Sequence, residues 1–155
     1  MKINWSNINH FTPEEFSEDP DRFADPKLII KLNIFRGLLG IPVYPSPVPG
    51  ALARFDGDPE SRHYAVGRQS DAVDVFCNCG IFRAWTAALH SGLWGGIGVY
   101  FDTKFRGGEW PMLHLDCRSK HVLWYREEHR YFIPANTGSW AFLGQLLARK
   151  VSKKS

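Results

Sequence analysis

Two short segments of this chain carry acidic and imidazole side chains inside runs that otherwise have the apolar composition of buried strands. Residues 72–76 read Ala-Val-Asp-Val-Phe, with Asp74 at the centre, and residues 112–118 contain His114 and Asp116. A polar or charged group in a buried strand is costly unless a partner compensates its lost hydration. Asp74, inside its strand, is therefore expected to pair with a cation or to bind a metal ion.

Apolar and polar side chains occupy different faces of the strand expected at residues 112–118. Successive side chains of a strand point to opposite faces. The even-numbered residues therefore share one face, which carries His114 and Asp116, while the odd-numbered apolar residues face the core. A half-buried strand with its polar side in water has the same pattern, so this segment alone leaves both interpretations open.

The composition is that of an ordinary globular chain. Its 155 residues are 44% hydrophobic and 23% charged, which excludes a disordered polymer and suffices for one domain, residues 1–155. The net charge is only +3, with much of the excess in a basic tail at 149–155, so we expect no nucleic-acid binding. Neither a secretory signal nor a bilayer-spanning run is visible, which predicts cytoplasmic synthesis without membrane insertion. The three cysteines are expected to be reduced thiols.

Helix signals occur in both halves of the chain. Thr-Pro-Glu-Glu at 12–15 predicts a short helix that ends before Pro20. Asp-Pro at 25–26 begins a second helix, in which apolar residues recur every three or four positions up to Gly40. Two further helices are expected, at 81–89 and 137–150.

Strand-like segments lie between these helices. Besides the two polar segments, we expect a turn that leads into a strand at 95–101 and one or two strands within 121–132, with a turn at 127–130. An edge strand is expected at the start of the proline-rich segment 41–54. The chain contains no internal repeat and no long linker. The sequence therefore predicts a single α+β domain with a small antiparallel sheet flanked by helices.

The polar side chains form a set that is typical of an open metal site. Two histidines and one aspartate from separate segments are the ligands of zinc sites that keep a fourth position for water. His63 lies in the loop before Asp74 and can fold back beside it, and His114 lies on the second strand. A single loop histidine is usually a surface residue, but the combination favours His63, Asp74 and His114 as the ligands of one zinc ion.

Three motifs spread over residues 10–125 resemble one enzyme family. Residues 61–74, Ser-x-His followed by Gly and Ala-x-Asp, are similar to the Ser-x-His…Gly-x-Ala-x-Asp signature of the D-alanyl-D-alanine carboxypeptidase family of zinc peptidases. Residues 96–100 and 114–118 resemble the Gly-Ile-Gly-Val-Tyr…His-Val-Asp-Val-Arg of its zinc carboxypeptidase branch. Residues 11–16 fit the Phe-x-x-x-Glu-Phe opening that is common there.

The resemblance implies the fold shared by Hedgehog domains and D-Ala-D-Ala peptidases, with Zn²⁺ held by His63, Asp74 and His114. The implied substrate is a peptidoglycan stem or cross-bridge peptide, cut at or near a D-amino acid. Arg54 stands where the family places an arginine near the substrate, and it is expected to stabilise charge on the carbonyl oxygen. The chain looks most like a phage-encoded protein, either a lysis enzyme released by a holin or a virion-associated wall peptidase that contacts tail proteins.

The spacing within the first motif departs from the family pattern. The stretch from His63 to Asp74 is longer than the tight spacing of the family, with an apparent insertion at 64–70. Asp71 is therefore an alternative ligand. Asp74 fits both the signature and the strand pattern better.

The general base is the second departure. Related enzymes carry an acid or a histidine shortly before the last ligand, where this chain has Pro-Met-Leu at 111–113. Asp116 is the first candidate for the base and Glu109 the second. Asp116 could instead orient His114 or pair with Arg118. Without a base, the chain would be a weakly active or inactive virion or tail protein that retains the fold. A third interpretation is a plain binding domain in which the histidines and aspartates are ordinary polar residues.

Overall fold

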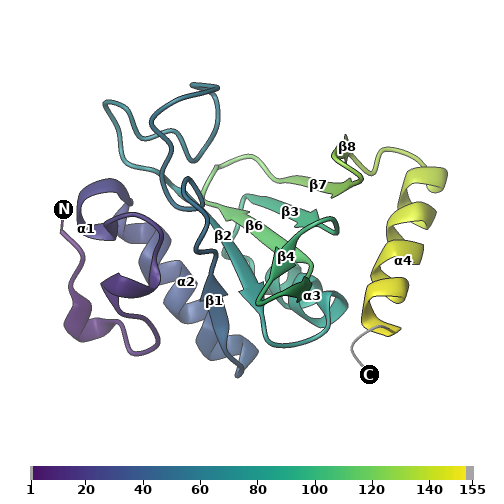
Figure 1. The fold of residues 1–155 in the computed structure, drawn as a ribbon, viewed down its shortest axis with the longest axis horizontal. Helices are drawn as coiled ribbons and strands as arrows, with labels where there is room; N and C mark the ends of the chain where they lie inside the picture. The colour runs from purple at the N-terminus through teal and green to yellow at the C-terminus, as the bar shows by residue number, and fades with distance from the viewer. Residues whose placement is uncertain (1, 153–155) are drawn as a thin grey trace.

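One six-stranded, mostly antiparallel sheet forms the centre of the computed structural model, which describes residues 2–152 (Figure 1). Its strands are β1 Val43–Pro45, β2 Ala72–Cys77, β3 Gly96–Tyr100, β6 Met112–Asp116, β7 Val122–Glu127 and β8 Arg130–Phe132. Their order across the sheet is β1-β2-β6-β3-β7-β8, and only the β3–β7 pair is parallel. A separate hairpin, which was not predicted, consists of β4 Lys104–Phe105 and β5 Gly108–Glu109.

Helices pack against this sheet within the described residues. They are α1 Pro20–Phe23, α2 Pro26–Leu39, α3 Ile81–Ser91 and α4 Thr137–Ser152, with 3-10 turns η1 Trp5–Asn7 and η2 Pro13–Glu15. Helix α3 contacts both α2 and α4 as well as β3 and β6, so these three helices form one layer. In Figure 1, α2 lies near β1 at one end of the sheet and α4 beyond β7 and β8 at the other. The result is the predicted small α+β domain.

The three helix-start patterns in the N-terminal region give different types of helix. The predicted helix at 12–15 is a single 3-10 turn, in which the backbone N–H of Thr12 donates to the Glu15 carboxylate at 2.9 Å. The Asp-Pro pair expected only to end it also begins α1, because the side chain of Asp19 accepts the backbone N–H of Asp21. Asp25 caps α2 in the same way, as predicted.

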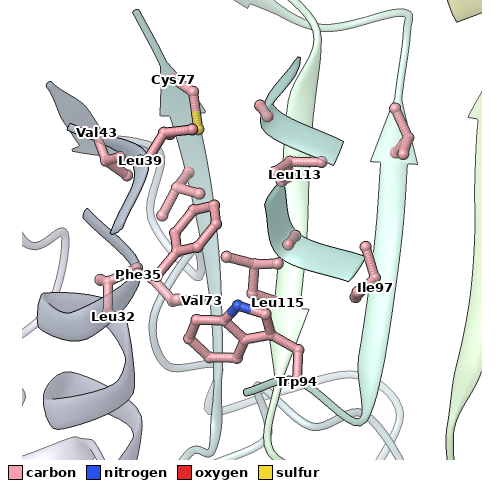
Figure 2. Packing of buried hydrophobic residues seen from close by; sticks show 14 of the residues in the cluster. Leu32, Phe35, Leu39, Val43, Val73, Cys77, Trp94, Ile97, Leu113 and Leu115 are labelled. Carbon is pink, nitrogen blue, oxygen red and sulfur yellow. The ribbon is translucent and has the colours of Figure 1, made fainter. Parts of the chain in front are cut away.

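The core lies between one face of the sheet and the helical layer. Leu113 and Leu115 of β6 point into it, together with Val73 of β2 and Phe35 of α2 (Figure 2). The alternation predicted for residues 112–118 is therefore confirmed on its apolar side. These side chains are at most 1% exposed, and they fix the orientation of every polar residue on the opposite face.

The opposite, polar face of β2 and β6 is not in water. Asp116 is fully buried, and Asp74 and His114 are each 5% exposed. The proline-rich segment continues the edge of the sheet beside β2: the backbone N–H of Asp74 donates to Ala51 O, and that of Ser46 donates to Asp74 O. The interpretation of a half-buried strand with a solvated polar side is therefore wrong.

The structure also bears on membrane-spanning helices and on the cysteines. No helix within residues 2–152 combines the length and the apolar character needed to cross a membrane. Cys77, Cys79 and Cys117 are thiols, as expected. The basic tail at 149–155 lies outside the residues whose side chains are described.

Candidate metal centre

The register of the sheet places Asp74 and His114 side by side. Asp74 of β2 is directly opposite His114 of β6, and His114 in turn is opposite Gly98 of β3. Residues that are paired across a sheet point to the same face. Gly98 leaves space there: a Cβ at this position would lie 2.5 Å from the ring of Trp124, which packs against the His114 imidazole at 5.0 Å.

His63 completes the group from the loop above the sheet. Its Nε2 lies 3.3 Å from Asp74 Oδ1 and 3.0 Å from His114 Nδ1, and the third distance, His114 Nδ1 to Asp74 Oδ1, is 3.0 Å. Ligand atoms bound to one tetrahedral zinc ion lie about 3.3–3.4 Å apart, given bonds of about 2.0–2.1 Å. The three predicted side chains therefore form a buried group that could hold a metal ion.

The loop of His63 is held by backbone pairing. The carbonyl of His63 accepts the N–H of Arg54 at 2.7 Å, and the N–H of Ala65 donates to the carbonyl of Arg54 at 2.8 Å. The segment that ends at Arg54 thus lies beside the histidine loop like a short strand. This pairing also places Arg54 beside the histidine loop.

Asp116 contacts the side of His114 that faces away from the other two ligands. Its Oδ2 lies 3.1 Å from His114 Nε2, and Arg118 Nε donates to both carboxylate oxygens at 2.8 and 2.9 Å. Gly96 permits this placement, because a Cβ there would lie 2.3 Å from the carboxylate. A carboxylate can only accept, so His114 carries a proton on Nε2. In the neutral imidazole, Nδ1 is then a bare lone pair that points at Asp74.

This arrangement calls for a positive charge within the group. Two lone-pair-bearing atoms, His114 Nδ1 and Asp74 Oδ1, cannot stably face each other at 3.0 Å in a buried site. A proton on Nδ1 or a metal ion between the ligands resolves the conflict. The geometry of Asp116 therefore favours the orienting role that the sequence analysis left open, and it places that carboxylate on the far side of the ligand.

The charges of the group follow from burial and pairing. Burial raises the pKa of Asp74, but the two neighbouring histidines outweigh it and hold this pKa well below its usual range. For His114, burial lowers the pKa, and hydrogen bonding to Asp116 and Asp74 raises it above its usual value. Asp74 is thus an anion at neutral pH, which is the form of this carboxylate that can bind a cation.

The two other acidic candidates lie elsewhere. The carboxylate of Asp71, the alternative ligand, pairs with the guanidinium of Arg62 and closes the inserted loop. Glu109 is exposed on the β4–β5 hairpin. It does not line the pocket at Asp74.

A pocket of about 250 Å³ opens beside Asp74. Arg54, Lys104 and Arg126 line it, and Asp74 is the single carboxylate among the described residues that do so. Tyr100 forms part of the wall, and burial raises the pKa of its phenol, which keeps the hydroxyl protonated at neutral pH. The pocket thus combines one carboxylate of the metal-binding group with three cations and with the hydroxyl groups of Ser46, Tyr100 and Thr103.

Two of the three pocket cations already have partners. Arg126 pairs with Asp102 at 2.8 Å and lies over the Tyr100 ring, 4.4 Å from its centroid. Arg54 is exposed, and its Nε donates to the carbonyl of Gly50 at 3.1 Å. Lys104 lies on the hairpin that was not predicted, and for this reason sequence reasoning missed it.

Tyr100 and Trp124 were also missed as site residues. A signal for them exists in the sequence, since two glycines inside one strand mark a close approach by another group. Which group approaches is decided by the parallel pairing of β3 with β7, which puts Trp124 opposite Gly98.

Comparisons with known proteins do not identify the chain. No family model, curated protein or solved structure matches it.

Proposed function

We propose that the chain is a zinc-dependent peptidase that hydrolyses peptidoglycan stem or cross-bridge peptides, with the Hedgehog/D-Ala-D-Ala peptidase-like fold that its motifs suggest. The observation that carries this proposal is the convergence of His63, Asp74 and His114, with ligand atoms 3.0–3.3 Å apart beside an open pocket. The donor set supports zinc, because imidazole and carboxylate ligands on three sides leave a fourth position for water or substrate.

Each residue has a chemical role in this proposal. His63, Asp74 and His114 hold the ion, and bound zinc supplies Lewis-acid polarisation of the scissile carbonyl and a nucleophile that is active near neutral pH. Arg54 at the pocket wall attracts an anionic peptide and stabilises negative charge on the carbonyl oxygen. The protonated hydroxyl of Tyr100 adds a hydrogen-bond donor on another wall of the pocket.

One observation favours a second candidate function. Apart from Asp74, no carboxylate among the described residues lines the pocket, and Asp116 is occupied by His114 and Arg118. A peptidase needs a base that reaches the attacking water. The alternative is therefore a weakly active or inactive virion or tail protein that binds the metal ion and retains the fold.

The site of action is part of the proposal. A wall-directed enzyme of this kind would be phage-encoded and would reach peptidoglycan either through a holin or as part of the virion. The pocket cations suit peptides that carry free carboxylates, which peptidoglycan peptides do.

Metal analysis followed by a digest tests the proposal. Purified protein should contain about one zinc ion per chain, and His114→Ala should lose it, whereas the exposed His121→Ala should keep it. The digest uses purified peptidoglycan and mass spectrometry of the released peptides. New peptide termini that depend on zinc and on His114 support the peptidase. Zinc binding without new termini leaves the structural alternative, and absence of zinc refutes both.

A further inference from the structure

The backbones of two metal ligands are joined by one short segment, residues 51–54. The N–H of Asp74 donates to the carbonyl of Ala51 at 3.0 Å, and the N–H of Arg54 donates to the carbonyl of His63 at 2.7 Å. This segment therefore links the sheet ligand to the loop ligand. Its position determines how close Asp74 and His63 come to each other.

A carboxylate from the N-terminal region holds this segment in place. Glu18 lies in the loop between η2 and α1, half-buried, more than thirty positions away in the sequence. Its Oε1 accepts the N–H of Gly50 at 2.5 Å, and its Oε2 accepts the N–H groups of Leu52 and Ala53 at 3.1 and 3.0 Å. One side chain thus satisfies three backbone donors of an irregular segment.

The groups around the Glu18 carboxylate are all donors, so they favour a charged acceptor. All three partners are N–H groups, and the hydroxyl of Ser17 donates to the same carboxylate at 2.6 Å. Burial raises the pKa of Glu18, but these hydrogen bonds outweigh it and lower this pKa below its usual value, so the side chain is an anion at neutral pH. Hydrogen bonds to a charged acceptor are stronger than neutral ones.

We propose that Glu18 is a positioning residue for the metal centre: it fixes residues 50–54, which in turn set the relative placement of His63 and Asp74. This inference rests on the proposed metal site. Glu18 itself does not touch the ion. Its role is to hold two ligands at the separation that a metal ion requires before the ion binds.

Glu18→Gln tests this role with little change in volume. The amide retains one acceptor oxygen and must turn its NH₂ group toward at least one backbone N–H. The matched control is Glu14→Gln, an exposed carboxylate on the same N-terminal segment. Zinc affinity is measured by competition with a chelator. The visible absorption spectrum of the Co²⁺-substituted proteins reports the geometry of the ligands.

The expected result is a loss of zinc affinity of about 10-fold or more in Glu18→Gln, in the range known for residues that support metal ligands. Its Co²⁺ spectrum should also change, while Glu14→Gln matches the wild type in both measurements. Equal affinities and spectra for the two variants overturn the role of Glu18. A wild-type protein that binds neither metal overturns the proposed function instead.

Hydrogen exchange of the wild-type protein gives a second test that needs no variant. Zinc should slow amide exchange at Arg54 and Asp74, because the ion fixes the two ligands that these amides connect. The same should hold for Leu52 and Ala53, whose amides bind Glu18. Unchanged exchange across residues 50–54 on zinc binding would overturn the proposed coupling.

Discussion

Replacing Asp116 with asparagine tests whether this outer carboxylate decides which nitrogen of His114 binds the metal. Every group around the Asp116 carboxylate is a donor: His114 Nε2 and the backbone and guanidinium N–H groups of Arg118. An asparagine side chain has one acceptor oxygen, so its NH₂ group must face one of these donors. When it faces His114, the imidazole proton moves to Nδ1, which can then no longer bind a metal ion.

The magnitude of this effect follows from linkage between binding and stability. Loss of an outer partner of a metal-bound histidine lowers metal affinity by about 10–100-fold. At a free zinc concentration about 1,000 times the wild-type Kd, zinc stabilises the wild type by about 4.1 kcal/mol. The variant gains about 2.7 kcal/mol for a 10-fold loss of affinity and about 1.4 kcal/mol for a 100-fold loss. The zinc-induced rise in Tm should therefore shrink by about 3–11 °C.

Thermal unfolding followed by circular dichroism gives the Tm of each protein. Measurements with chelator report the stability without zinc, and measurements at buffered free zinc report the zinc-induced rise in Tm. Asp102→Asn is the matched control, because Asp102 also pairs with an arginine, Arg126, but outside the metal-binding group. This control should lower Tm in chelator and keep the full zinc-induced rise. An undiminished rise in Asp116→Asn would refute the orienting role of Asp116, and a wild type without any rise would refute the metal site.

Three further predictions concern packing, pH and ligand choice. Gly98→Ala places a Cβ 2.5 Å from the Trp124 ring and should lower the free energy of unfolding by about 1–3 kcal/mol in urea melts; an unchanged midpoint contradicts the close approach. For Asp102, burial raises the pKa, but hydrogen bonds from Arg126 and from a backbone N–H outweigh it and lower this pKa. Asp102 therefore stabilises the fold at pH values above its pKa in the unfolded chain, about 3.9. This stabilisation is lost as the pH falls through the lower pKa of the folded protein. The stability difference between wild type and Asp102→Asn should shrink below about pH 4 in melts from pH 3 to 7. A difference that stays constant over this range would contradict the lowered pKa of Asp102. Asp71→Asn should keep the zinc content of the wild type in elemental analysis, and loss of zinc would make Asp71 a ligand after all.

Local signals in the sequence were sufficient for most elements of the fold. The Asp-Pro cap at 25–26, the apolar period of α2 and the alternation in residues 112–118 depend on neighbours within a few positions. Each therefore predicts its element without knowledge of the rest of the chain. The η2 turn and the additional start of α1 at Asp19 show the limit of this approach, because one cap pattern is compatible with either type of helix.

By itself, the sequence predicted the side chains of the metal-binding group, with Asp71 as an alternative to Asp74. Asp74 and His114 stand out because a carboxylate or an imidazole inside an apolar strand has few stable explanations. His63 was added because it lies in the loop before Asp74 and within the same motif. The sequence also limited the fold to one α+β domain, through the order and length of its apolar segments.

Only the tertiary structure decided how the group is oriented and held. Asp71 is excluded by its pairing with Arg62, Asp116 is placed behind His114, and Glu18 reaches residues 50–53 across more than thirty positions of sequence. The Glu18 contact leaves no periodic trace in the local sequence, because it joins segments that are far apart along the chain and depends on the path of an irregular loop. Alternation placed Asp116 on the same face as His114, but the orientation of its carboxylate behind the imidazole follows from the packing of the side chains.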